Sequence, residues 1–309
     1  MYHNPVLLNE SVESLEIKNG GIYVDLTFGG GGHSKEILKK IDKSGKLIAF
    51  DQDIDAHKNA IKDPRFHLLH QNFIYLKQNL EYLGINKVDG VLADLGVSSF
   101  QFDTNERGFT YANNSRLDMR MDVSSELDAV SLLNDYDESE LSRIFFDFSD
   151  LRNSRKIAQL ICVNRKNKKI QTSDELNKIL KSLYNDSYKN KFLARVYQAI
   201  RIEVNNEINA LKKMLNQVVE VLSKNGIVSI ITYHSIEDRL VKRFFKNSCF
   251  DNEPKKDHYG NKILSLKPKY NFITPSKSEL KLNNRSRSAK LRSAIKTVSY
   301  THLTLPTKA

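Results

Sequence analysis

The sequence predicts an α/β fold in which a doubly wound, mostly parallel sheet is interrupted by an inserted all-helical segment. Short apolar strands alternate with helices over residues 22–93, and such alternation is typical of a parallel sheet with right-handed crossovers. Apolar residues then recur at helical spacing from 128 to 204, with no strand-like alternation. A β-branched strand resumes the sheet at 227–232.

Four strands are expected in the first part of the chain. They cover residues 22–26, 46–50, 66–70 and 87–93. The connecting helices are predicted over 34–41, 55–61 and 73–83, and Gly84 ends the last of them. In sheets of this kind ligands bind at the carboxyl ends of the strands. The candidate site residues are therefore expected where these strands end.

The second part of the chain is predicted to contain fewer strands. Residues 95–103, LGVSSFQFD, have the composition of a loop, and the helical spacing that follows predicts an insertion of about a hundred residues. An amphipathic helix is expected over 207–222. After the strand at 227–232, Ser235 is placed to cap another helix, with Asp238 at the capping-box position. The basic remainder contains one predicted strand, at 262–266.

Four consecutive glycines, Gly29 to Gly32, join the first strand to its helix. Glycine allows positive φ and lets a ligand approach the main chain closely. The free N–H groups at a helix start add hydrogen-bond donors and a partial positive charge. A plain strand-to-helix connection is the alternative, but it rarely needs more than one or two glycines. The turn therefore predicts a ligand-binding loop.

The acidic residue at the end of the second strand indicates an adenosine cofactor. A dinucleotide fingerprint needs a third glycine, where this chain has Ser34, and an acid about 20 residues further on. That acid is present as Asp51, whose carboxylate could accept two hydrogen bonds from a ribose diol. NAD and S-adenosylmethionine both carry this ribose, and the missing glycine favours S-adenosylmethionine only mildly.

Two further side chains lie near predicted strand ends. Phe73, just past the third strand, could stack on an adenine ring or belong to the core between helix and sheet. His234, at the end of the strand over 227–232, could contact a base or a phosphate, or could simply hold a loop. Both alternatives stay open for each residue.

Positive charge is concentrated at the C-terminal end. The chain has a formal net charge of +11, yet residues 239–309 hold 17 Lys and Arg against four Asp and Glu, whereas the rest holds 31 against 33. A solvated lysine-rich tail would have this composition. The asymmetry favours instead a surface that binds a polyanion such as RNA.

Composition excludes several other classes of protein. The two cysteines, Cys162 and Cys249, are far apart and lack metal-ligand spacing, so neither a disulfide scaffold nor a metal site is predicted, and a reducing cytoplasm fits. The N-terminus has no signal-peptide pattern. No apolar run approaches the roughly 18 residues that a membrane span needs.

Six motifs in order give the sequence a family resemblance. They are TFGGGGHS, ADLGVSSFQFD, RGF, LDMRMD, YHSIEDRLVKRFF and RSRSAKLR. Together they resemble the RsmH (MraW) family of bacterial 16S rRNA (cytosine-N4)-methyltransferases, collinearly over roughly residues 2–295. The resemblance implies a class I (Rossmann-like) methyltransferase fold and S-adenosylmethionine as methyl donor. The implied acceptor is the exocyclic N4 of a cytidine in the decoding centre of 16S rRNA.

The resemblance also implies site residues by matching position. The cofactor contacts would be Gly31, Gly32, His33, Asp51, Phe73, Asp94 and Gln101. Asp94 and His234 are the candidate catalytic residues, and Asp94 could touch the cytosine, the cofactor or both. The sequence departs from the family's usual pattern at Tyr233 and Ile236, where phenylalanine and leucine are usual.

The expected domains follow from the same likeness. Residues 1–103 and 205–295 would form a discontinuous S-adenosylmethionine-binding domain, and 104–204 a helical substrate-recognition domain. Residues 296–309 match nothing in the family and are expected to be a non-native tail. The partner would be 16S rRNA or the small ribosomal subunit, with the oligomeric state, monomer or homodimer, left open.

Two other classes of function remain. A non-catalytic RNA-binding or ribosome-assembly protein could use the same fold. An NAD-dependent oxidoreductase would need a catalytic Lys, Tyr or His set that cannot be assembled from this sequence.

Overall fold

The computed structural model describes residues 5–297. Within this range the chain forms two compact units. Residues 5–51, 55–96 and 211–297 form an α/β unit, and residues 52–54 and 97–210 form a helical unit. The predicted assignment of 1–103 with 205–295 to cofactor binding, and of 104–204 to substrate recognition, stays a prediction.

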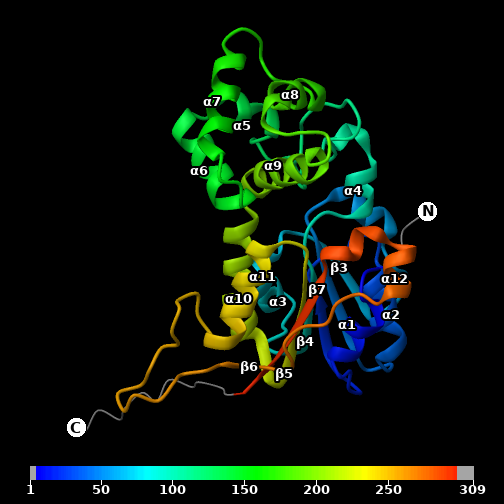
Figure 1. Cartoon of the computed structure of the whole chain (residues 1–309). Helices are drawn as coiled ribbons and strands as arrows, with labels where there is room; N and C mark the ends of the chain where they lie inside the picture. The colour runs from blue at the N-terminus through cyan, green and yellow to red at the C-terminus, as the bar shows by residue number, and fades with distance from the viewer. Residues whose placement is uncertain (1–4, 298–309) are drawn as a thin grey trace. The chain divides into compact units, whose positions relative to one another are not determined.

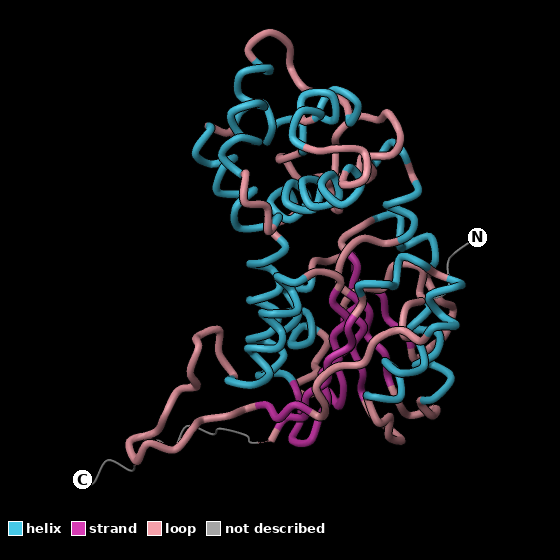
Figure 2. The backbone as a smooth tube through the Cα atoms, viewed as in Figure 1, coloured by secondary structure: helices cyan, strands magenta, loops and turns pink. Residues whose placement is uncertain are grey.

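A seven-stranded sheet forms the centre of the α/β unit, in the order β3-β2-β1-β4-β5-β7-β6 (Figures 1 and 2). The strands are β1 (Ile22–Asp25), β2 (Lys46–Asp51), β3 (Phe66–His70), β4 (Val88–Asp94), β5 (Leu222–Thr232), β6 (Leu266–Pro268) and β7 (Lys290–Lys296). Strands β1 to β5 run parallel, whereas β7 is antiparallel to both β5 and β6. The predicted mostly parallel, doubly wound sheet is confirmed. The strand order reverses at β1 and β4, which is where such sheets bind ligands.

Both faces of the sheet are largely buried along β1, β2 and β4, which explains why these strands are mostly apolar. Along β1, Val24 belongs to the core shared with α3, α10 and α11, and Tyr23 belongs to the core shared with α1 and α2. The helices of this unit are α1 (Leu8–Ser14), α2 (Gly32–Lys40), α3 (Leu76–Tyr82), α10 (Glu207–Val221), α11 (Ser235–Asn247) and α12 (Lys277–Leu282). Three 3₁₀ turns, η1 (Ile54–Asn59), η2 (Phe73–Tyr75) and η5 (Asn284–Ser288), complete the connections.

The helical unit has the core that the sequence spacing predicts. Its elements are α4 (Ser99–Asp103), η3 (Asn105–Arg107), α5 (Ala129–Asp135), α6 (Glu138–Ser149), α7 (Ser154–Arg165), α8 (Ser173–Ile179), η4 (Lys181–Leu183) and α9 (Lys189–Val204). The apolar face expected for α6 consists of Leu141, Ile144, Phe145 and Phe148. The first three are buried in one cluster with α5, α7, α8 and α9, and Phe148 packs against it partly buried. None of the helices between residues 5 and 297 has the length and hydropathy that crossing a bilayer requires.

The predicted loop over 95–103 contains a short helix instead. The Ser98 hydroxyl accepts the N–H of Gln101, and the Gln101 side chain accepts the N–H of Ser98 in return. This reciprocal capping box satisfies two donors that would otherwise lack partners at the helix start. The loop-like composition concealed the Ser-x-x-Gln pattern, so the prediction was wrong here.

Other boundaries differ for similar local reasons. The helix expected over 55–61 is the 3₁₀ turn η1. Helix α11 is capped by His234, whose Nδ1 faces the N–H of Glu237 at 3.4 Å, rather than by Ser235. The predicted capping-box residue Asp238 binds Arg292 of β7 instead.

The C-terminal strands were largely missed. The expected strand at 262–266 is replaced by β6, which begins at Leu266, and β7 was not predicted at all. Lys296 is the last residue of β7 and pairs with Leu266, so the ordered fold continues into the stretch expected to be a non-native tail. Residues 298–309 of that stretch lie outside the described residues.

Candidate functional site

Three carboxylates stand at one edge of the parallel sheet. Asp25 ends β1, Asp51 ends β2 and Asp94 ends β4. Asp25 is level with Ala49 of β2 and Leu92 of β4, so Asp51 and Asp94 each stand two residues beyond it on the flanking strands. The sheet therefore gathers acidic groups at its switch point.

The glycine turn is fastened to the end of β2. Asp51 Oδ2 accepts the N–H of Gly29 at 2.7 Å, and the Asn59 amide donates to the Gly29 carbonyl at 3.2 Å. A carboxylate has several acceptor positions, so Asp51 can bind the turn and still accept from a ligand hydroxyl. The structure therefore brings together the glycine turn and Asp51, both of which the sequence predicts to contact the cofactor.

Packing gives the glycines a reason beyond ligand approach. Gly31, the N-cap of α2, has φ of +74°, and an added Cβ would lie 2.8 Å from the Phe28 ring. A Cβ on Gly32 would lie 2.0 Å from Cγ of Pro5. The N–H groups of the first turn of α2 have no acceptors within the helix. The turn is therefore rigidly packed on one side and carries donors at the helix start.

His33 is buried, and its orientation is fixed. Its Nε2 lies 3.1 Å from the Val6 carbonyl oxygen, and because a carbonyl can only accept, Nε2 carries the proton. The other nitrogen, Nδ1, lies 3.9 Å from Oδ2 of Asp94. His33 thus has Nε2 committed to the Val6 carbonyl and turns Nδ1 toward Asp94.

Asp94 is held from two further directions. The Tyr233 hydroxyl donates to Asp94 Oδ1 at 2.7 Å, and the Asp94 N–H donates to Thr27 Oγ1 at 2.6 Å. Burial raises the pKa of the Asp94 carboxyl to about 6. The neighbouring Asp25 and Glu237 also raise this pKa, whereas His33 and the Tyr233 hydroxyl lower it.

Asp25 and Tyr233 are perturbed by the same surroundings. Burial raises the pKa of Asp25, although its carboxylate accepts the Ser34 hydroxyl at 2.6 Å. Burial, followed by the charge of Asp94, holds the pKa of Tyr233 well above its ordinary value. Tyr233 therefore remains a hydrogen-bond donor at neutral pH.

The remaining candidates of the α/β unit have structural contacts as well. Phe73 is half-buried at the start of η2 and packs against the core to which α3 contributes Leu76 and Leu80. His234 is largely buried, with Nδ1 at the start of α11 and Nε2 3.1 Å from Glu237 Oε1. Its contacts are those of a residue that holds the loop between β5 and α11.

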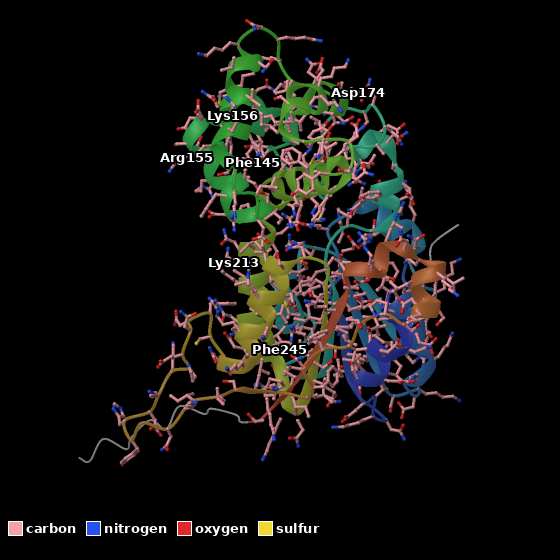
Figure 3. The ribbon with its side chains drawn as sticks, viewed as in Figure 1. Phe145, Arg155, Lys156, Asp174, Lys213 and Phe245 are labelled. Atoms are coloured by element: carbon pink, nitrogen blue, oxygen red, sulfur yellow. The ribbon has the colours of Figure 1, made fainter. Side chains whose placement is uncertain are left out.

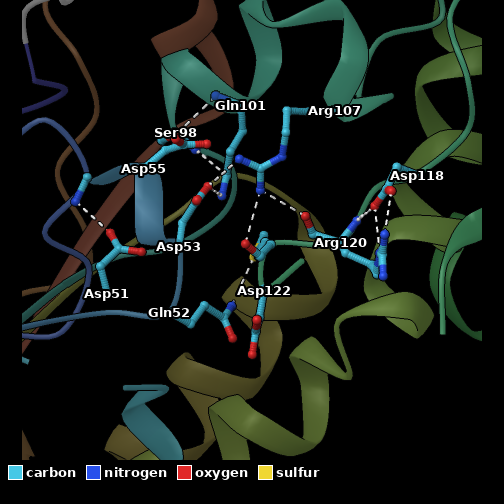
Figure 4. A network of polar contacts seen from close by, with 12 residues as sticks. Asp51, Gln52, Asp53, Asp55, Ser98, Gln101, Arg107, Asp118, Arg120 and Asp122 are labelled. Carbon is cyan, nitrogen blue, oxygen red and sulfur yellow. Dashed lines mark hydrogen bonds and ion pairs between the residues drawn. The ribbon is translucent and has the colours of Figure 1, made fainter. Parts of the chain in front are cut away.

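Gln101 belongs to the helical unit, where it is buried in a polar cluster (Figure 4). Its amide donates to Asp53 Oδ2 at 2.7 Å, and Arg107 Nη1 donates to the same oxygen at 2.8 Å. Arg107 Nη2 reaches the carbonyls of Arg120 and Met121, each at 3.0 Å. The other six predicted cofactor residues all lie in the α/β unit.

Comparisons with known proteins show the family of this chain. The model of the MraW methylase family matches residues 1–297. The chain belongs to this family. It is 54% identical to ribosomal RNA small subunit methyltransferase H of Christiangramia forsetii, over 96% of the chain and 98% of the relative. The identity is 52% to the protein of the same name in Flavobacterium johnsoniae and 47% to that in Phocaeicola vulgatus, with the same two coverages. The resemblance inferred from the motifs is confirmed.

Within this candidate site, sequence reasoning missed two groups around Asp94. Thr27 and Tyr233 both contact it, and neither was proposed as a site residue. Each lies just past a strand end, Thr27 after β1 and Tyr233 after β5. That position was the available signal, because residues past the carboxyl ends of parallel strands share one edge.

Proposed function

We propose that this chain is an S-adenosylmethionine-dependent methyltransferase that methylates the exocyclic N4 of a cytidine in 16S rRNA. The observation that carries the proposal is the partly buried Asp94 carboxylate, which ends β4 beside the glycine turn and is held by Tyr233. Family membership supports the reaction class, and the relatives' names support a small-subunit rRNA substrate. The position of that cytidine in the decoding centre rests on the family resemblance.

The charges at the strand ends fit S-adenosylmethionine better than NAD. The segments that follow β1, β3, β4 and β5, residues 26–34, 71–75, 95–96 and 233–238, contain no Lys or Arg. Three strand-terminal aspartates and Glu237 lie at or near these segments. This environment favours a ligand with ammonium and sulfonium cations and disfavours a pyrophosphate. NAD-dependent oxidoreduction is therefore not favoured.

The residues proposed to hold the cofactor follow from the same edge of the sheet. Asp51 would bind the ribose diol, and the Phe73 ring would lie beside the adenine. The backbone of Gly31, Gly32 and His33 would offer N–H donors at the start of α2. Asp94 and Gln101 complete the proposed set. When bound, S-adenosylmethionine supplies an electrophilic methyl group, so the protein need not generate one.

Asp94 is proposed to act on the substrate amine. Cytosine N4 is a poor nucleophile because its lone pair is delocalised into the ring. A carboxylate that accepts an N4 hydrogen bond draws the amine toward tetrahedral geometry and orients it for attack. With a pKa of about 6, Asp94 is mostly ionised at neutral pH. A stronger base is not needed, because the methylated amine is acidic and loses its proton after transfer.

Exposed cations of both units are proposed to contact the RNA backbone. Within 151–173 there are seven Lys and Arg and no Asp or Glu. Six of them are exposed on α7 or beside it, namely Arg152, Arg155, Lys156, Lys166, Lys168 and Lys169, and Lys168 stands in an ion pair with Glu175. Figure 3 shows Arg155 and Lys156 at the outer side of α7. Such a surface suits phosphates of single-stranded or irregular RNA, in which a cytosine can be splayed out.

The predicted C-terminal basic surface is smaller than its composition indicates. Arg292 is buried and binds Asp238 at 2.7 Å, and Lys290 binds the same carboxylate at 3.1 Å. These two cations join β7 to α11 and are therefore engaged within the fold. Lys242, Arg243, Arg285 and Arg287 are exposed and stay candidates for phosphate contact. Activity on ribosomal RNA would place the protein in the cytoplasm.

The test is transfer of labelled methyl from S-adenosylmethionine to undermethylated small subunits and to naked 16S rRNA, followed by mapping of the product nucleotide. We expect N4-methylcytidine from the wild-type chain and none from Asp94→Ala. Calorimetry with S-adenosylhomocysteine and with NAD, using residues 1–297, identifies the cofactor. RNA binding without transfer would support the non-catalytic alternative, and wild-type turnover in Asp94→Ala would remove Asp94 from the mechanism.

A further inference from the structure

Tyr233 is fixed at both its backbone and its hydroxyl. It directly follows β5, and its ring is half-buried against the apolar cluster of Val6, Leu7 and Ile231. Its N–H donates to Glu237 Oε2 at 3.0 Å, and its hydroxyl donates to Asp94 Oδ1 at 2.7 Å. The hydroxyl therefore reaches across from the end of β5 to the end of the neighbouring strand β4.

The two oxygens of Asp94 are in different surroundings. Oδ1 accepts from Tyr233, whereas the group nearest Oδ2 is His33 Nδ1 at 3.9 Å, which is too far for a hydrogen bond. Among residues 5–297, Oδ2 thus has no donor at hydrogen-bonding distance.

We propose that Tyr233 is a positioning residue for methyl transfer, which holds Asp94 through Oδ1 and so leaves Oδ2 as the acceptor for the substrate amine. The proposal rests on the function proposed for Asp94 above. The family resemblance has phenylalanine at this position, so packing accounts for the ring but not for the hydroxyl. The contact with Asp94 gives the hydroxyl a role.

The groups that face Asp94 determine how its titration responds to Tyr233. His33 approaches from α2, Asp25 from β1 and Glu237 from α11, in addition to Tyr233 itself. The two acids favour the protonated form of Asp94, and His33 and the Tyr233 hydroxyl oppose them. Removing the hydroxyl leaves the two acids and the burial in place. The Asp94 pKa should therefore rise in Tyr233→Phe.

The experiment compares Tyr233→Phe with the wild-type chain in two ways. Methyl transfer at saturating substrates is measured from pH 5.5 to 9, and the Asp94 carboxyl is titrated by ¹³C NMR, with Asp94→Asn used to assign the resonance. A hydrogen bond to a charged group corresponds to roughly one pH unit or more. In Tyr233→Phe we expect the acidic limb of the pH–rate profile and the midpoint of the Asp94 NMR titration to move to higher pH by about that amount. The rate at pH 6.5 should fall several-fold, whereas above pH 8.5 it should approach the wild-type value.

Tyr197→Phe is the matched control. Tyr197 is a buried tyrosine of the helical unit whose hydroxyl lies 3.3 Å from the Ser173 carbonyl and 3.2 Å from Asn177 Oδ1. Its substitution removes a buried hydroxyl without touching Asp94, so both the limb and the midpoint should stay in place. Thermal unfolding and S-adenosylhomocysteine affinity at pH 8.5 show whether either variant is altered in folding or cofactor binding.

The possible results separate the two proposals. The positioning role is overturned if the acidic limb of the pH–rate profile and the NMR midpoint of Asp94 both stay in place in Tyr233→Phe. It is also overturned if the rate falls uniformly at every pH, because that is the effect of a packing defect. Absence of transfer by the wild-type chain would count against the proposed function instead. In that case the NMR titration still determines whether the Tyr233 hydroxyl controls Asp94.

Discussion

At the scale of one residue, Asp94 combines its proposed catalytic role with an energetic cost. Its carboxyl has a pKa of about 6 in the folded chain against 3.8 as the ordinary value, because burial penalises the charged form. The folded state therefore binds the proton more tightly than the unfolded state does. Stability from this group is present at low pH and is lost as pH rises from about 4 to about 6.

We accordingly predict that Asp94→Asn loses methyl transfer but gains stability at pH 7. The two-unit difference in pKa corresponds to about 2 kcal/mol after allowance for the partly exposed carboxyl. Urea unfolding at pH 7 and at pH 4.5 measures the effect, and the gain should fall to about a third at the lower pH. If Asp94→Asn and the wild-type chain are equally stable at pH 7 as well as at pH 4.5, the Asp94 carboxylate is not destabilised by its surroundings.

Sequence reasoning found the acids and glycines of the site more readily than their mutual contacts. The turn and Asp51 were predicted together because a known binding pattern spaces them along the chain, and Asp51 does bind Gly29. Tyr233 and Asp94 are 139 residues apart. No local pattern connects residues at that distance, so their contact became visible only when β4 and β5 were paired.

At the scale of elements, predictability depended on whether a strand or helix is apolar. Strands β1, β2 and β4 were anticipated because both of their faces are buried in apolar cores, and the edge strand β3 because Phe66, Leu68 and Leu69 pack against those cores. Strand β7 was missed because Arg292 and Lys296 point into buried positions, where ion pairs and backbone carbonyls satisfy them. The pattern of apolar residues carries no information about such compensated charges.

The ion pair between α11 and β7 leads to a prediction about stability. Asp238 of α11 binds Arg292 of β7, and both side chains are largely buried. Asp238→Ala would leave the Arg292 guanidinium buried without its carboxylate, at a cost of about 3–5 kcal/mol. Urea unfolding measures the loss. Asp186→Ala is the control, because Asp186 is exposed in its pair with Lys181 and should contribute less than about 1 kcal/mol. Similar small effects in both variants would contradict a structural role for the buried pair.

At the scale of the whole molecule, the distribution of charge matters more than the total of +11. The strand-end segments proposed to bind the cofactor lack Lys and Arg, whereas the stretch over 151–173 lacks Asp and Glu. These are opposite environments on one chain. They suit a cationic methyl donor and a polyanionic acceptor respectively, which is the combination that methylation of RNA requires.

This separation predicts that RNA affinity depends on the cations of α7 more than on net charge. The variant Arg152→Gln, Arg155→Gln, Lys156→Gln removes three exposed charges. Each lost phosphate contact should reduce the slope of log affinity against log salt by about 0.7, the value for single strands. Filter binding of 16S rRNA from 50 to 300 mM salt should therefore show weaker binding and a slope lower by about two, with S-adenosylhomocysteine affinity unchanged.

A second triple variant distinguishes local contact from overall charge. In the α/β unit, Lys39 and Lys58 are exposed and Lys77 is partly exposed, but each stands in an ion pair, with Glu36, Asp55 and Glu220 respectively. Changing these three to glutamine alters the net charge by the same amount. If RNA is held mainly by long-range attraction to the whole molecule, both variants should lose the same affinity. If α7 contacts phosphates, only the α7 variant should change the salt slope, because counterions are released only where phosphates are bound.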